Sequence, residues 1–109
     1  MSLVVKVHHK GDCTVIAVCD PDLVGKVFEE GDLRLDLSGD FYKGDIIEKT
    51  EVGDLIRNAD CVNLVGKNSV KLGVSEGIIE EGHIKFIDGI PHAQAVILQE
   101  WFVCQKPPV

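Results

Sequence analysis

The chain has 109 residues, of which 45% are hydrophobic and 27% charged, and it carries a formal net charge of −7 at pH 7. This length suits one domain with a real core, and the richness in Val, Ile and Leu excludes a disordered chain. The acidity argues against direct nucleic-acid binding, because phosphate neutralisation by Lys and Arg dominates the affinity of such proteins.

Membrane and metal functions also find little support in the sequence. No apolar run approaches the ~20 residues of a membrane-spanning helix, and the first residues turn polar too soon for a signal peptide, so we expect a cytoplasmic protein. No two cysteines form a Cys-x-x-Cys pair, which argues against a zinc ribbon. We expect reduced cysteines, no metal and no cofactor; the cysteines are Cys13, Cys19, Cys61 and Cys104.

Two strands are predicted at the amino-terminal end. Within residues 3–9, Leu3, Val5 and Val7 alternate with Val4, Lys6 and His8. Residues 13–19 read CTVIAVC, which is apolar on both faces. A glycine-containing turn separates them, so we expect a hairpin. The two-sided apolar pattern is typical of a central strand that is covered on each side.

A helix is predicted next, beginning at Asp20-Pro21 and ending at Gly31. Asp favours the capping position of a helix, and Pro fits its first turn. Four apolar residues would share one face of this helix: Leu23, Val24, Val27 and Phe28. Alternation then predicts a strand at 33–37, and we interpret residues 38–49 as a loop.

The second half of the chain predicts short helices and strands in alternation. The helices cover about 50–59 and 67–76, and the strands cover 61–65, 83–87 and 92–99. Together with the first half, this pattern predicts a single α+β domain over residues 1–109. We expect a mixed or mostly antiparallel sheet of about five to six strands with two to three short helices, followed by a tail at 100–109.

The first candidate site is the hairpin around His92. Asp88-Gly89 is a strong signal for a two-residue turn, which places Lys85 opposite His92 and puts Gln94 on the same polar face. The opposite face would be apolar and would hold Ile84, Phe86, Ala93 and Ile97. Three interpretations of His92 remain open: a hydrogen-bonding strand residue, a ligand contact, or a general base.

The second candidate site is the junction between the strand at 61–65 and the following helix. Asn63 interrupts the apolar strand, and Gly66 and Lys67 open the helix. The free N–H groups of a helix start attract anions, so this junction could contact a phosphate or carboxylate. The alternative is ordinary capping, because the stretch lacks the spacing of a phosphate-binding loop.

No catalytic motif accompanies these sites. The sequence contains no Gly-x-Ser-x-Gly elbow, no His-Glu-x-x-His and no glycine-rich dinucleotide fingerprint, so we assign no catalytic residue. Phe41 and Tyr42 in the loop are interpreted as anchors or, alternatively, as stacking platforms. The candidate binding residues are His92, Gln94, Asn63, Gly66, Lys67, Tyr42 and Lys26.

Three separated stretches resemble one family. They are AVCDPDLVGKVFEEGDLRLDLSGDFYKG at 17–44, NLVGKNSVKLGVSEGII at 63–79 and GIPHAQ at 89–94. They resemble an archaeal family catalogued as domain of unknown function 424, over about residues 3–99. The resemblance implies a cytoplasmic α+β domain without an established activity. It also favours an association with translation. The family's recurring polar positions would map onto Asp20, Gly25, Lys26, Tyr42, Asn63, Gly66, His92 and Gln94.

Two classes of function follow from these observations. The first is a non-catalytic binding module with a protein or ribonucleoprotein partner, favoured by the small size and the absence of catalytic motifs. The alternative is a small enzyme or an anion or small-molecule binder, with His92, Gln94 and Asn63 converging in a concave pocket. A lesser hypothesis is a homodimer through the tail, because Trp101, Phe102 and Val103 are costly to expose.

Overall fold

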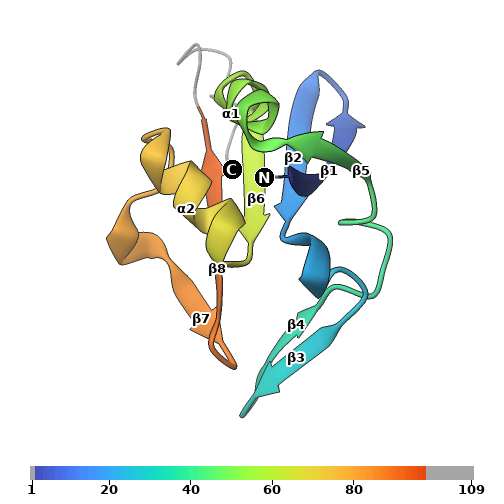
Figure 1. The fold of residues 1–109 in the computed structure, drawn as a ribbon, viewed down its shortest axis with the longest axis vertical. Coiled ribbons are helices and arrows are strands. Elements are labelled where there is room, and N and C mark those ends of the chain that lie inside the picture. Colours follow the sequence, from blue (N-terminus) through green and yellow to red (C-terminus); the bar gives the residue numbers. More distant parts are fainter. Residues whose placement is uncertain (1, 98–109) are drawn as a thin grey trace.

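The computed structural model describes residues 2–97 of the chain. It has the predicted α+β fold, with a mixed six-stranded sheet and two helices (Figure 1). A separate two-stranded sheet and two 3-10 turns were not predicted. The strands are β1 (Ser2–Lys10), β2 (Cys13–Cys19), β3 (Val27–Glu30), β4 (Leu33–Asp36), β5 (Asp45–Glu48), β6 (Cys61–Val65), β7 (Lys85–Ile87) and β8 (Ile90–Val96). The helices are α1 (Lys49–Arg57) and α2 (Lys67–Ser75), and the 3-10 turns are Pro21–Leu23 and Glu81–His83.

The large sheet has the strand order β5-β1-β2-β6-β8-β7. β2 and β6 are parallel neighbours, and the other adjacent pairs are antiparallel. The apolar strand β2 therefore lies inside the sheet, as its two-sided pattern predicted. Between residues 2 and 97, no helix is long and apolar enough to cross a membrane.

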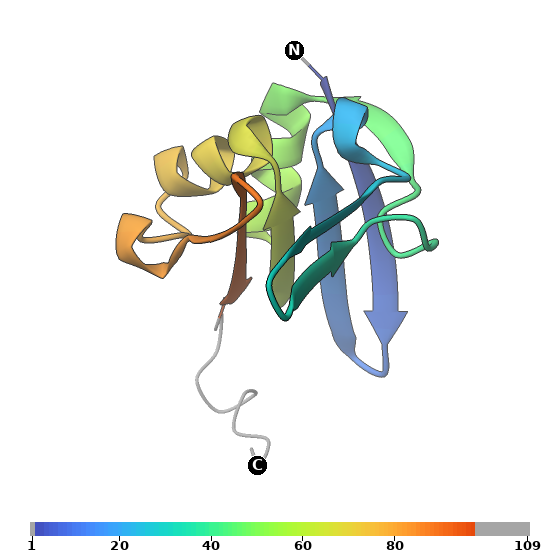
Figure 2. The same cartoon turned by 90° about the horizontal axis from the view of Figure 1, so that it is seen from below.

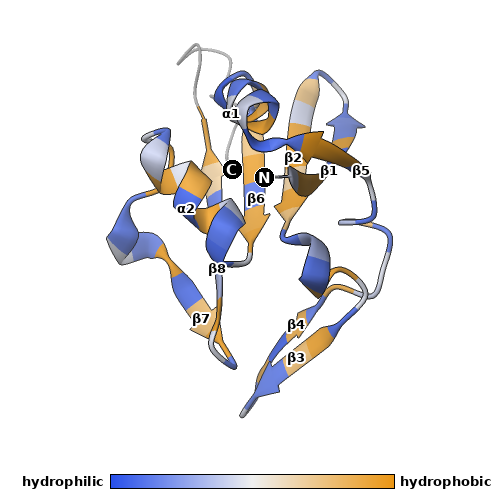
Figure 3. Cartoon of the chain, in the orientation of Figure 1, coloured by the Kyte–Doolittle hydropathy of each residue, from blue (hydrophilic) through white to orange (hydrophobic). Residues whose placement is uncertain are grey.

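Both helices cover the same face of the large sheet, and they lie in front of it in Figure 1. Val52 and Ile56 of α1 and Val70 of α2 pack with Val18 and Leu64 of the central strands in the main core. The strands are largely hydrophobic in Figure 3, whereas hydrophilic residues mark the helices and one band of β6. Burial of these side chains, at about 25 cal/mol per Å², supplies the main driving force for this packing.

A second, smaller apolar cluster lies on the other face of the sheet, at one end. Here Phe28 and Leu35, which are paired across β3 and β4, pack with the buried side chains of Cys19 and Val65. Figure 2 shows the two-stranded β3–β4 ribbon crossing in front of the large sheet. The β3–β4 hairpin therefore covers one end of this face, and neither α1 nor α2 packs on it.

The predicted helix beginning at Asp20 is wrong. Only Pro21–Leu23 forms a single 3-10 turn, and Val27–Glu30 forms β3. Gly25 has a φ of 91°, which is incompatible with a continuing right-handed helix. The apolar residues that suggested a helical face still reach a core, but they do so from an irregular turn and a strand.

Two further boundaries differ from prediction. The expected loop at 38–49 contains β5, which pairs with the start of β1 at the edge of the sheet. The predicted strand at 83–87 begins only at Lys85, because Glu81–His83 forms a 3-10 turn in which the His83 N–H donates to Glu80 O. The second change leaves part of β8 without a neighbour on its outer side.

Candidate functional site

We call the face of the large sheet opposite α1 and α2 the open face. Alternation along the paired strands determines which side chains lie on it, and they include Lys6, His8, Lys10, Cys13, Val15, Ala17, Cys19, Cys61, Asn63, Val65, Lys85, His92, Gln94 and Val96. The main core lies on the other face. His92 is thus separated from the aliphatic core side, as the two-residue periodicity predicted.

Asn63 and Gln94 face each other directly across β6 and β8. His92 lies two residues from Gln94 and is paired with Val65. Side chains directly opposite in an antiparallel pair are ~5 Å apart at Cβ, and diagonal neighbours lie within ~8 Å. The structure therefore brings the three polar residues together on the open face.

The ring of His92 combines partial burial with a nearby positive charge. The ring as a whole is half-buried, but its Nε2 is enclosed and has no hydrogen-bond partner among the described residues. Burial lowers the pKa of His92, and Lys85, opposite it on β7, lowers it further. The imidazole is therefore held neutral at physiological pH, a form that can accept a hydrogen bond.

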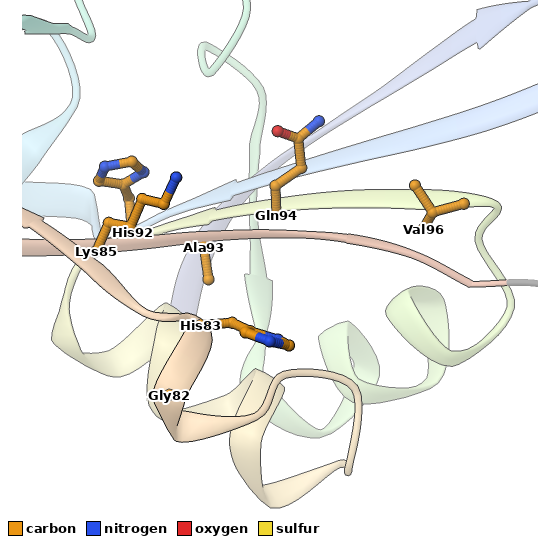
Figure 4. Close-up of a pocket in the computed structure, with 7 residues that line it drawn as sticks. All are labelled: Gly82, His83, Lys85, His92, Ala93, Gln94 and Val96. Atoms are coloured by element: carbon orange, nitrogen blue, oxygen red, sulfur yellow. The ribbon is translucent and has the colours of Figure 1, made fainter. Parts of the chain in front are cut away.

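A pocket of about 520 Å³ adjoins these residues. In Figure 4 the side chains of Lys85, His92 and Gln94 lie on one side of β8, whereas His83 and Ala93 lie on the other. The pocket therefore wraps around the outer edge of β8 and is not a cavity sunk into the open face. This shape suits a contact with an extended partner better than enclosure of a small substrate.

Electrostatics distinguish the open face from the rest of the molecule. None of the 18 Asp and Glu residues lies in β1, β2, β6, β7 or β8. The ionisable side chains that these strands place on the open face are all lysines, histidines and cysteines: Lys6, His8, Lys10, Cys13, Cys19, Cys61, Lys85 and His92. In a chain of net charge −7, five of the six strands therefore add no carboxylate to this face. The edge strand β5 adds Glu48, opposite Ser2, and the β3–β4 ribbon over one end carries Glu29, Glu30 and Asp36.

The predicted anion site at Gly66 and Lys67 is occupied by the protein itself. The carboxylate of Asp20 accepts hydrogen bonds from the backbone N–H groups of Asn68 (3.1 Å) and Ser69 (2.8 Å). It also accepts from the Asn68 amide at 3.3 Å and the Ser69 hydroxyl at 2.8 Å. The start of α2 is therefore capped from a distance, and the capping interpretation accounts for its free N–H groups.

Gly66 has the geometry that this cap requires. Its φ is 106°, and a Cβ at this position would lie 2.3 Å from the Asp20 carboxyl carbon. Lys67 is exposed and lines a separate pocket of about 350 Å³ with Asp20 and Asp22. The structure therefore does not join Gly66 and Lys67 to the pocket at His92.

Tyr42 and Lys26 do not line the pocket at His92. Tyr42 packs against the smaller apolar cluster, and burial, reinforced by Cys19, raises its pKa to about 12. Its neighbour Phe41 stacks on His8 with ring centroids 4.4 Å apart, and the His8 ring bonds to Phe41 O at 2.9 Å. These contacts favour the interpretation of Phe41 and Tyr42 as anchors of the loop. Lys26 is exposed and lies directly before β3.

Three of the four cysteines lie among the described residues. Cys13 and Cys61 are half-buried and Cys19 is buried, whereas Cys104 lies outside the described residues. Burial, with Asp20 and Asp22 nearby, raises the pKa of Cys19 to about 12. Within residues 2–97, no three His, Cys, Asp or Glu side chains gather closely enough to hold a metal ion.

A protein-family model matches the part of the chain that contains the candidate site residues. The family model described as "Protein of unknown function (DUF424)" matches residues 7–98. The chain belongs to this family. The DUF424 match includes His92, Gln94, Asn63 and Asp20, and it ends at residue 98, so the tail at 100–109 lies outside it.

A solved structure shares the DUF424 chain's fold. It is the crystal structure of an uncharacterized conserved protein from Methanopyrus kandleri, with a TM-score of 0.79 and 28% sequence identity. The match covers 92% of this chain and 95% of that one. No curated protein matches the chain.

Sequence reasoning missed two features of the site region. The role of Asp20 in capping α2 joins residues that are 48 positions apart in the sequence, Asp20 and Asn68, although the Gly-x-x-Ser spacing at the helix start was a usable signal of a cap. The outer edge of β8 was missed because the strand at 83–87 was expected to cover it. Only the early 3-10 turn at Glu81–His83 exposes it.

Proposed function

We propose that this DUF424 protein is a non-catalytic binding module that docks a protein or ribonucleoprotein partner on the open face. The carrying observation is the charge separation: five strands form most of this face and none contributes a carboxylate, in a chain with 18 of them. Such a surface favours an acidic partner locally, while the net charge disfavours indiscriminate binding of polyanions.

The polar group at Asn63, Gln94 and His92 supplies directed contacts within this surface. Asn63 is half-buried and Gln94 is exposed, so the pair offers amide donors and acceptors next to the neutral imidazole. A partner from the translation apparatus fits this chemistry, because ribosomal complexes present acidic protein and phosphate surfaces.

The experiment compares charge reversals on opposite sides of the molecule. Lys85→Glu alters the open face, whereas Lys71→Glu makes the same charge change on an exposed position of α2. Both variants and the wild-type chain are immobilised for capture from an archaeal lysate and are tested for sedimentation with ribosomes, at low and physiological salt. We expect Lys85→Glu to lose the partner at least about tenfold and Lys71→Glu to retain it.

Two results would contradict the binding module. One is that neither capture nor sedimentation recovers a partner at either salt concentration. The other is equal loss in both variants, which would indicate a general effect of charge. Gln94→Ala then tests the amide contacts without changing the charge.

One observation favours the small-molecule alternative. The enclosed Nε2 of His92 lacks a partner among the described residues and lies beside the pocket of about 520 Å³. A bound ligand would satisfy this nitrogen. Nitrogen-15 spectra of the His92 ring, recorded with small carboxylates, amines and nucleosides, test this alternative, and an unchanged ring signal throughout would count against it.

A further inference from the structure

The outer edge of β8 is open beyond the end of β7. β7 pairs only with Ile90–His92 of β8. On the inner side, the Ile97 N–H donates to Asp60 O at 2.7 Å, and Pro91 O accepts from the Gly66 N–H at 2.9 Å. Since these odd-numbered residues point towards β6, the N–H and C=O groups of Gln94 and Val96 point outwards.

No described backbone group pairs with the outward-facing groups of Gln94 and Val96. An unpaired strand edge of this kind is a template for another strand, and proteins normally cover it. The Val96 side chain is 64% exposed, which adds apolar surface to the same edge. The edge therefore needs an occupant that supplies both backbone groups and apolar side chains.

Pockets flank this edge on both faces of the sheet. The pocket of about 520 Å³ adjoins Gln94 and Val96 on the outer edge (Figure 4). A second pocket of about 400 Å³ is lined in part by Ile78, Ile79 and Ala95, on the side where α2 ends. An added strand would therefore find room for alternate side chains above and below the sheet.

The chain itself contains a segment that matches this edge. Twelve residues follow Ile97, and Trp101, Phe102 and Val103 are the strand-forming part of them. We propose that residues 101–103 fold back along β8 and pair with it as an additional antiparallel strand. This inference stands on the strand edge and does not depend on the partner proposed above.

The register follows from which groups of β8 point outwards. Pairing of Trp101 with Val96 and of Val103 with Gln94 uses both outward-facing residues. Phe102 then lies on the other face, next to Ala95 and the pocket that Ile78 and Ile79 line. The reversal takes a four-residue loop at 97–100, which is usually built around a type I turn and accepts most residues.

Connection within one chain favours this occupant over a separate molecule. A segment joined directly to the strand it covers has an effective local concentration in the millimolar range. The DUF424 match ends at residue 98, so the segment is an extension of this chain beyond the family region. It covers a strand edge that would otherwise promote association between molecules.

Amide hydrogen exchange and fluorescence of the full-length chain test the proposal. We compare the wild type with Phe102→Asp, which places a charge next to Ile78, Ile79 and Ala95, and with the control Gln105→Asp, which introduces the same charge outside the strand. We expect the Gln94 and Val96 amides to exchange at least about tenfold faster in Phe102→Asp only. Trp101, the single tryptophan, should become more accessible to acrylamide in the same variant.

Three outcomes would overturn this pairing. The first is rapid exchange of both amides in the wild type, which leaves the edge free for an external partner. The second is equal protection in wild type and Phe102→Asp. The third is protection that rises with protein concentration together with a dimer in sedimentation, which assigns the edge to a second copy.

Discussion

At the scale of single residues, Asp20 connects two distant segments of the chain. It follows β2, is 4% exposed and accepts four hydrogen bonds from Asn68 and Ser69 at the start of α2. Removal of the carboxylate leaves buried donors without an acceptor, which costs more than the loss of an exposed cap. Asp20 is therefore a structural residue, although in the sequence it falls on one of the family's recurring polar positions.

We predict that Asp20→Ala lowers the free energy of unfolding by about 2 kcal/mol or more. Asp22→Ala, at an exposed position two residues away, should change it by less than about 0.5 kcal/mol. Urea denaturation of both variants measures the difference. Equal stability of the two variants would show that the cap contributes little.

His92 gives stability a dependence on pH. Because burial and Lys85 lower its pKa below the ordinary value of 6.5, the unfolded chain takes up the proton before the folded chain does. This contribution is complete above about pH 6.5 and is lost as the pH falls through the range below it. We expect a difference below about 1 kcal/mol, since the ring is half-buried and water screens Lys85.

The measurement compares unfolding free energies at pH 7.5 and 5.5 for the wild type and His92→Gln. The wild type should lose more stability on acidification than the variant, which has no titrating ring at this position. His83→Gln serves as a control, because His83 is exposed. An identical pH dependence in wild type and His92→Gln would rule out the neutral buried imidazole.

At the scale of elements, the contact between α2 and β6 depends on a glycine. A Cβ at Gly73 would lie 2.4 Å from the Leu64 Cδ1 atom and 2.8 Å from Ile79 Cγ1. In α1, a Cβ at Gly53 would meet the ends of two long side chains, Glu76 Oε2 at 2.9 Å and Arg57 Nη1 at 3.6 Å. The two helical glycines thus differ in what surrounds them, although Ala is the better helix former at both.

We predict that Gly73→Ala destabilises the protein by about 1–3 kcal/mol, because an overpacked core forces side chains from their preferred rotamers. Gly53→Ala should be close to neutral, since the gain in helix propensity offsets a shift of Glu76. Thermal unfolding followed by circular dichroism compares the two. If Gly73→Ala raises the melting temperature, the close approach of α2 to β6 is wrong.

The elements also show what the sequence could and could not predict. The turn at Asp88-Gly89 predicted the pairing of Lys85 with His92, because both turn residues adopt positive φ and fix the register locally. The helix predicted at 20–31 failed, because β3 is stabilised by β4 and by Cys19 and Val65. Those contacts are distant in sequence and leave no local periodicity to detect.

The candidate site divides in the same way. Asn63, Gln94 and His92 share a face because strand alternation and one turn determine it, and both are local properties. The fate of Gly66 and Lys67 depends on Asp20, which approaches them only after β2 and β6 pair in parallel. Sequence reasoning therefore predicted the polar group on the sheet but could not tell that the helix start was already occupied.

At the scale of the whole molecule, the carboxylates lie outside five of the six strands of the large sheet. The carboxylates lie in helices, loops and β3–β5, while β1, β2, β6, β7 and β8 have none. Like charges are therefore close together on the parts that surround the large sheet. Their mutual repulsion opposes the compact state and is weakened by salt.

We predict that sodium chloride stabilises the protein, with a melting temperature about 2–5 °C higher at 0.5 M than at 20 mM salt. Sodium chloride is preferred to sulfate, because sulfate also strengthens the burial of apolar surface. The double variant Glu80→Gln and Asp32→Asn removes two exposed negative charges at nearly constant shape, so its salt response should be smaller. A melting temperature that is constant or falls with salt would mean that attractive ion pairs, such as Arg57 with Glu76 and Asp54, outweigh the repulsion of the net charge.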